Sequence, residues 1–150
     1  MTTTTTLDQL PTLIGTDLGY TEYVTITQDR VNLFAEAAND DQWIHTDPER
    51  AASGPFGGAI AHGFLTLSLT IPFWTELLEV EGVTAKVNYG LDRVRFITPV
   101  PVGSRIRMTA TIASVDDVKG GLQITVDQTV EIEGQERPAL ISRGIHRFYA

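Results

Sequence analysis

Two residues suited to acid–base chemistry, Asp40 and His45, lie five positions apart in a polar segment that follows an amphipathic stretch. We expect this segment to be irregular chain between helices, where catalytic residues are common. A carboxylate and an imidazole placed in this way can hold one water molecule, and imidazole exchanges protons near neutral pH. Packing against Trp43 and Ile44 would bring both pKa values into a working range. The same spacing would be found if the aspartate only capped a helix and the histidine were only its hydrogen-bonded partner. The catalytic and the structural interpretation therefore both stay open.

A backbone group is the other candidate, because Gly63 stands at the expected start of a strongly apolar helix. The first N–H groups of a helix are unpaired and lie at the positive end of its dipole. A glycine there lets a ligand come close, and the N–H could stabilise an enolate formed from a thioester. Close helix packing would also explain Gly63. For His62 we favour a capping or space-filling role, and for His146 a packed or exposed place in a strand.

Other kinds of site are excluded by what the sequence lacks. The chain has no cysteine, which rules out disulfides, thiolate catalysis and zinc sites built on cysteine. It has neither a G-x-S-x-G elbow nor a phosphate-binding P-loop. His45 and His62 look too few and too isolated in sequence for a metal site, so we predict that no metal is bound.

Length and composition predict one globular domain over residues 1–150. Hydrophobic residues make up 42% of the 150 residues and charged residues 20%. We expect residues 1–14, which include a run of threonines, to be partly disordered. No apolar run approaches the ~20 residues of a membrane span and no secretory pattern is visible, so we expect a cytoplasmic protein that does not bind membranes.

Charge argues against nucleic acid as a partner, because the formal net charge is −8. Most of the basic side chains lie in the second half of the chain, where an anionic ligand would find its counter-charges. Arg93 and Arg95 belong to this group. Solvated positions on strands are the alternative explanation for them.

The first half of the chain predicts three helices. Thr27 is a good N-cap for the first, and Asp47-Pro48 opens a short one that spans residues 48–52. The third begins near His62 and is apolar on every side, which is typical of a buried helix. Pro72 is expected to kink it or to shorten it.

The second half predicts an antiparallel sheet. Apolar and polar residues alternate along residues 105–112 and 122–132, and further strands are expected over residues 86–97 and 139–149. This period of two indicates one packed face and one wet face. A sheet wrapped around the apolar helix buries both, so we predict an α+β fold.

Three segments resemble one family. Residues 34–48, FAEAANDDQWIHTDP, resemble the hydratase motif of the MaoC-like (R)-specific enoyl-CoA hydratases, in particular of the single-domain actinobacterial members. Residues 60–64, IAHGF, resemble the I-A/V-H-G segment of that family. Residues 94–103 resemble its later strand and P-V-x-x-G turn. The resemblance covers the chain from about Gly15 to Tyr149.

The resemblance implies a single hot-dog domain, in which a curved antiparallel sheet wraps around a central helix, and a homodimer. It assigns catalysis to Asp40 and His45 and the oxyanion N–H to Gly63. Further residues would bind or support the substrate, namely Gln42, Ala61, His62, Arg93 and Arg95. The family commonly has Asn-Pro where this chain has Gln42 and Trp43, which leaves the pocket shape and the acyl preference open.

The implied reaction is reversible syn addition of water to trans-2-enoyl-CoA, giving (3R)-hydroxyacyl-CoA. The CoA thioester is the substrate, and no metal or redox cofactor is implied. Three alternatives remain: a (3R)-hydroxyacyl-ACP dehydratase of fatty acid synthesis, a hot-dog acyl-CoA thioesterase, and a non-catalytic acyl-binding subunit. The presence of both Asp40 and His45 argues against the last two. The sequence does not show which of the two is the base.

Overall fold

The computed structural model describes all 150 residues. Its helices and strands, in chain order, are β1 (Thr3–Thr6), the 3-10 helix η1 (Leu10–Leu13), β2 (Asp17–Tyr20), β3 (Val24–Thr25), α1 (Gln28–Ala38), α2 (Trp43–Thr46), α3 (Pro48–Ala52), α4 (Gly63–Leu77), β4 (Leu78–Glu81), β5 (Ala85–Phe96), β6 (Arg105–Val118), β7 (Gly121–Ile132) and β8 (Leu140–Tyr149). The first, second and third helices of the sequence prediction are therefore α1, α3 and α4.

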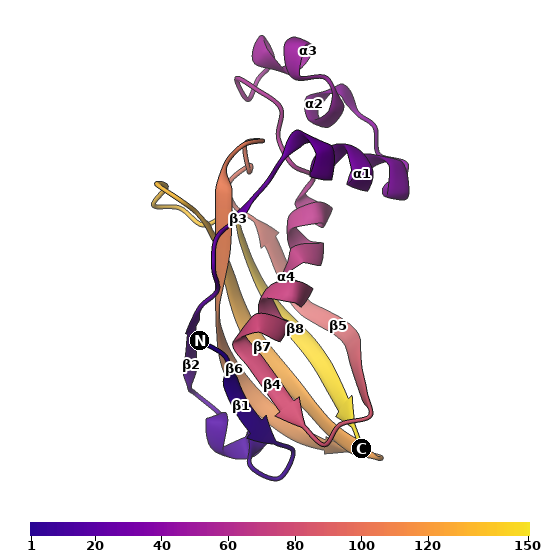
Figure 1. Ribbon diagram of the computed structural model, residues 1–150, viewed down its shortest axis with the longest axis vertical. Coiled ribbons are helices and arrows are strands. Elements are labelled where there is room, and N and C mark those ends of the chain that lie inside the picture. Colours follow the sequence, from indigo (N-terminus) through magenta and orange to yellow (C-terminus); the bar gives the residue numbers. More distant parts are fainter.

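A curved antiparallel sheet forms most of the molecule, and its strands follow the order β2-β6-β7-β8-β5, with β3 also paired to β6. In Figure 1 the helix α4 lies along one face of this sheet, while α1, α2 and α3 gather at the end where α4 begins. The sheet side chains that point toward α4 join one hydrophobic cluster of 24 buried residues. This arrangement confirms the predicted α+β class, with a sheet wrapped around one apolar helix.

The prediction that α4 is buried on every side is wrong for one stripe of the helix. Phe64 is 68% exposed and Ile71 is 36% exposed, because the sheet covers only the opposite side. Pro72 does not shorten the helix, which continues to Leu77. Pro72 has no N–H to donate to the carbonyl of Ser68, four residues earlier in the helix. Both residues are exposed, so water can hydrogen-bond that carbonyl. None of the helices has the length and apolar character needed to cross a membrane.

The N-terminal segment is more ordered than its composition predicts. Residues Thr3–Thr6 form β1, which pairs in parallel with β4, and Leu10 is completely buried. Threonine is β-branched and fits a pleated strand, so a threonine run can serve as a strand once a partner is available. The expectation that residues 1–14 are partly disordered fails because β4 supplies that partner.

His146 is buried on the inner side of β8, where its ring stacks on Trp74 with 5.4 Å between the ring centroids. Its Nδ1 lies 3.2 Å from the side-chain oxygen of Asn88 on β5. Burial lowers the pKa of His146 to about 4. The imidazole is therefore neutral at pH 7 in the folded protein.

We expect the free energy of unfolding to fall as the pH is lowered from about 6.5 to about 4. In this interval His146 is protonated in the unfolded chain but not in the folded one, so unfolding takes up a proton and acid favours it. The difference in pKa corresponds to a loss of about 3 kcal/mol. Urea unfolding at pH 7 and pH 4.5 measures this loss. The variant His146→Gln should lose less stability in acid, and an equal loss in both proteins would contradict the assignment.

Candidate active site

The end of α1 places Asp40. Asn39 caps the helix in the left-handed conformation, with φ of 54°, and asparagine tolerates this conformation better than most residues. The backbone N–H of Asp40 then donates to the carbonyl of Ala35 at 3.0 Å. These bonds turn the chain sharply, so that Asp40 begins the segment that leads to α2.

His45 lies on the single helical turn α2, not on irregular chain as we expected. Its Nδ1 is 2.7 Å from the backbone oxygen of Ile60. Because a carbonyl oxygen only accepts, Nδ1 carries the proton and Nε2 keeps its lone pair. The side chain of Gln28 on α1 donates to the carbonyl of His45 at 2.7 Å and ties this turn to α1.

The surroundings keep His45 neutral. Burial lowers the pKa of its imidazole, and the neighbouring His62 lowers it further. The hydrogen bond to Ile60 and the charge of Asp40 act in the opposite direction without reversing the shift. At neutral pH the free Nε2 is therefore available to accept a proton.

His62 joins the two candidate residues. It occupies the N-cap position of α4 without capping the helix through its side chain. Its ring stacks on His45 with 3.8 Å between the centroids, and its Nε2 donates to the backbone oxygen of Asp40 at 2.8 Å. The His62 ring also packs against the Phe34 ring, with 4.9 Å between the ring centroids. The preferred sequence interpretation, that His62 caps the helix or fills space, is therefore incomplete.

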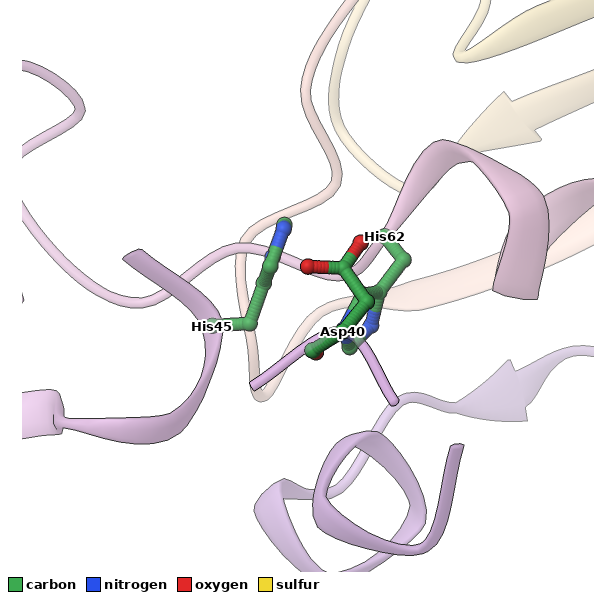
Figure 2. A group of neighbouring side chains, drawn as sticks. All are labelled: Asp40, His45 and His62. Atoms are coloured by element: carbon green, nitrogen blue, oxygen red, sulfur yellow. The ribbon is translucent and has the colours of Figure 1, made fainter. Parts of the chain in front are cut away.

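The three side chains form one cluster. The side-chain ligand atoms of Asp40, His45 and His62 all lie within 4.8 Å of one another. Figure 2 shows the carboxylate of Asp40 beside the outer edge of the His45 ring, with His62 next to both. The assumption that His45 and His62 are isolated from each other is wrong, because α2 and the start of α4 meet here.

We expect His62→Phe to lower kcat about fivefold, since it keeps an aromatic ring on His45 but loses one hydrogen bond to Asp40, worth about 1 kcal/mol. His62 acts as a positioning residue, so KM should change little. Steady-state kinetics on one thioester would separate the two effects. His62→Gln, which keeps a donor but no aromatic ring, serves as the comparison. An unchanged kcat in His62→Phe would show that the hydrogen bond does not position Asp40.

Gly63 opens onto a cavity of about 210 Å³ that is also lined by His45, Ala61, Thr66 and Phe96. The N–H of Gly63 has no hydrogen-bond partner in the protein, as expected for the first residue of a helix. A Cβ on Gly63 would lie 3.0 Å from the Phe96 ring, so the absence of a side chain leaves room for that ring. Asp40 does not line this cavity and stands beside it, next to His45.

Short backbone bonds hold this cavity together. The N–H of Ile60 donates to Ile44 at 3.0 Å, and the N–H of Ala61 donates to Val100 at 2.8 Å. The Gln42 carbonyl accepts from the His45 N–H at 3.0 Å, while the Gln42 side chain makes no hydrogen bond. The predicted supporting residues Ala61 and Gln42 therefore act through their backbones.

Trp43 does not shape the cavity. Its ring lies under the guanidinium of Arg50 at 4.3 Å and leaves no space for a side chain on Gly54. It therefore packs toward α3, away from Gly63 and His45. The replacement of the family's proline at this position strengthens the packing of α3.

Arg93 and Arg95 are the two predicted site residues that the structure does not bring to the cavity. They pair with Arg143 and Ile141 of β8 and share the outer face of the sheet with them. Phe96, one position further, faces inward and lines the cavity, because neighbouring residues of a strand point to opposite faces. The hydrogen bond from Arg143 is the main cause of the lowered pKa of the Asp127 carboxyl, and the nearby charge of Arg93 adds a smaller lowering effect.

Sequence reasoning missed several residues that build the site. Asn39 could have been found, since an asparagine after the last apolar position of a helix is a stop signal. Gln28 and Ile60 act through contacts between distant segments, which leave no local signal. The sequence pattern indicates only that Phe96 belongs to a strand, because alternation does not show which cavity a strand residue lines.

The sequence and the fold of this chain are both similar to those of known proteins. Residues 9–134 match the family model of the MaoC-like domain. The chain belongs to the MaoC-like dehydratase family. This MaoC-like protein is therefore a hydro-lyase, an enzyme that adds or removes water.

Its relatives include a 3-hydroxyacyl-thioester dehydratase Z of Mycobacterium tuberculosis, which is 49% identical over the whole of both chains. Among solved structures, a monoamine oxidase regulatory protein from Archaeoglobus fulgius is 26% identical, with a TM-score of 0.75 over 91% of this chain and 90% of the other. An (R)-hydratase from A. caviae, involved in PHA biosynthesis, is 22% identical, with a TM-score of 0.73 over 89% and 94%. The hot-dog fold expected from the resemblance is thereby confirmed.

Proposed function

We propose that this protein is an (R)-specific enoyl-CoA hydratase, which adds water to trans-2-enoyl-CoA and runs in reverse as a 3-hydroxyacyl thioester dehydratase. One observation carries the proposal. The free Nε2 of neutral His45 and the carboxylate of Asp40 lie together beside a cavity that also receives the unpaired N–H of Gly63. The name of the mycobacterial relative, a 3-hydroxyacyl-thioester dehydratase, supports the same substrate class.

The first step is polarisation of the thioester. Its carbonyl oxygen accepts a hydrogen bond from Gly63 N–H at the start of α4. Negative charge grows on this oxygen when a nucleophile adds to C3, so a donor fixed in advance stabilises the transition state. The dipole of the 15-residue helix α4 acts in the same direction.

The second step is the addition itself. A water molecule donates one hydrogen bond to Asp40 and one to Nε2 of His45, and its oxygen attacks C3. One of the two residues accepts a proton as the C3–O bond forms and the electrons of the double bond move to the enolate. The same proton then returns to C2 on the same face, so that the net change is addition of one water. The (3R) product follows from the family resemblance.

The test is the loss of enoyl absorbance when trans-2-enoyl-CoA substrates of short and medium length are mixed with the protein. We expect the absorbance to fall and chiral analysis to give the (3R)-hydroxyacyl product. Release of free CoA would point to a thioesterase, and binding without turnover to an acyl-binding subunit. Faster turnover of the same acyl group on acyl carrier protein would make the carrier protein the substrate.

We also propose that no metal takes part, because Asp40, His45 and Gly63 together provide proton transfer and oxyanion stabilisation. We expect prolonged treatment with EDTA to leave the rate of hydration unchanged. The cluster of Asp40, His45 and His62 has spacing that a divalent metal could also use. A loss of activity in EDTA that zinc restores would replace this proposal with a metal-assisted one.

We further propose that the chain pairs as a homodimer through β5. This strand lies at the edge of the sheet and is exposed along almost its whole length. Apolar side chains gather there and on the uncovered stripe of α4, namely Phe64, Ile71, Val87, Tyr89, Leu91 and Phe96. A long apolar edge strand is a template for pairing with another chain. Light scattering should give twice the chain mass of 16.4 kDa, and a mass of 16.4 kDa would contradict pairing.

A further inference from the structure

A second cavity, of about 230 Å³, lies between α4 and the strands β5 and β8. Leu67, Thr70 and Ile71 of α4 line it, as do Gly90 and Leu91 of β5. Register shifts of β5 at residues 88–90 and 91–93 flank this part of the strand. Such bulges bend a strand and are frequent beside binding sites. The proposed catalytic chemistry does not use this cavity.

The floor of this cavity is polar in the middle of an apolar sheet. Gln128 stands in the inward row of β7 between Val126 and Val130 and is only 2% exposed. His146 on β8 is 6% exposed and lines the same cavity. Buried glutamine and histidine side chains are normally hydrogen-bonded throughout, because an unpaired polar group loses its hydration without compensation.

One atom of each side chain has no partner in the protein. Ser142 donates to the Gln128 oxygen at 2.9 Å, which leaves the Gln128 Nε2 unpaired. The Nδ1 of His146 faces the Asn88 oxygen at 3.2 Å and therefore carries the proton. His146 Nε2 is left as an unpaired acceptor. The cavity thus offers one N–H donor and one nitrogen acceptor.

Gln128 and His146 line the cavity together with Gly144. A Cβ built on Gly144 would lie 3.2 Å from His146 Nε2 and 3.3 Å from Gln128 Oε1, the oxygen that Ser142 bonds. These distances are shorter than ordinary van der Waals contact, so only a residue without a side chain leaves both polar groups uncrowded at the wall of the cavity. Asn88 on one side and Trp74, stacked on the His146 ring, on the other hold the imidazole in place.

The second cavity and the catalytic cavity are both lined by residues of α4. Gly63 and Thr66 line the first cavity. Thr70, about one turn after Thr66, and Ile71, about two turns after Gly63, line the second. Eight residues of helix separate Gly63 from Ile71, which is about 12 Å. An extended carbon chain covers that distance with roughly nine to ten carbon atoms.

We propose that the cavity over Gly144 binds a hydroxyl group near the tenth carbon of the acyl chain, so that the enzyme prefers acyl thioesters oxygenated far from the carbonyl. This inference rests on the proposed function. A hydroxyl can donate to His146 Nε2 and accept from Gln128 Nε2 at the same time. A methyl group would leave both atoms unpaired, and a carboxylate would bring a lone pair against the imidazole acceptor. A site that hydrogen-bonds a substrate hydroxyl discriminates strongly against an analogue without that hydroxyl, because its polar groups are then left unpaired. A site that recognises shape alone discriminates less.

The test compares two substrates of equal length, trans-2-enoyl thioesters of ten carbons with a terminal hydroxyl and of eleven carbons with a terminal methyl. We expect kcat/KM to favour the hydroxyl substrate about tenfold or more. The variants Gln128→Met, which removes the donor, and Gly144→Ala, whose methyl group crowds His146 Nε2 and Gln128, should both bring the ratio close to one. Because both substrates use the same catalytic residues, the ratio is independent of any general loss of activity.

The outcomes separate the two proposals. A ratio near one in the native protein, a preference for the methyl substrate, or a preference that survives in both variants would overturn the hydroxyl site. Turnover of six-carbon but not of ten-carbon thioesters would also overturn it, because the chain would not reach Gly144. If no enoyl thioester of any length is hydrated, the proposed function fails, and this inference fails with it.

Discussion

Replacing Asp40 with asparagine is expected to slow hydration of enoyl thioesters by about a hundredfold to ten-thousandfold. The substitution keeps the size of the side chain but removes the charged acceptor beside Nε2 of His45. An amide oxygen can still accept a hydrogen bond from the water but cannot take its proton, so the proton loses one of the two places that can receive it. The rate of absorbance loss at saturating substrate measures this effect directly.

The neighbouring residue provides the matched control for this change. Asp41 is also exposed and carries the same charge, but its side chain does not belong to the cluster with His45 and His62. We expect Asp41→Asn to hydrate substrate at close to the native rate. Both variants should have native circular dichroism and bind a saturated acyl-CoA equally well. A large loss in Asp41→Asn and none in Asp40→Asn would move the catalytic role by one residue.

Removal of the Gly63 N–H is the second change with a large expected effect. Gly63 is the first residue of α4, where a proline fits the helix without breaking a hydrogen bond. His62 has φ of −60° and ψ of 139°, a conformation that is favourable before proline. Gly63→Pro therefore removes the donor while keeping the backbone. We expect kcat to fall about a hundredfold to a thousandfold, as for loss of one oxyanion donor.

The side chain added in this variant needs its own control. A Cβ at residue 63 comes within 3.0 Å of the Phe96 ring, whichever residue carries it. Phe96 is 49% exposed and can turn away, so the crowding itself should be modest. Gly63→Ala adds the same Cβ but keeps the N–H, so the difference between the two variants isolates the donor. Equal rates in Gly63→Ala and Gly63→Pro would show that this N–H does not bind the thioester oxygen.

Local patterns predicted the main elements of the fold well. The strands of alternating character, the N-cap at Thr27 and the short helix Pro48–Ala52 were each confirmed, because period and capping chemistry are local properties. The start of α4 at Gly63 was also found. Strand β1 was missed, since a run of threonines becomes a strand only against β4, 75 residues away in sequence.

The candidate site was only partly visible in the sequence. Asp40, His45 and Gly63 were identified by residue type and by resemblance, and the structure brings them together. The contribution of His62 depends on stacking between α2 and α4, which no local pattern reports. The polar pair formed by Gln128 and His146 was overlooked for a different reason. Gln128 interrupts the apolar row of β7, and a single interruption does not change the period.

The strand order of the sheet also bears on how the chain folds during synthesis. The side chains and the N–H assigned to catalysis all come from residues 40–63, whereas the strands against which α4 rests, β6, β7 and β8, begin at Arg105. A ribosome delivers the chain from its N-terminus, so the apolar helix emerges well before its supporting sheet exists. Pairings between distant segments also form slowly, because the loops between them must close first. The catalytic residues are thus made early but gain their final positions late, and until then a growing chain presents α4 to chaperones or to other unfinished chains.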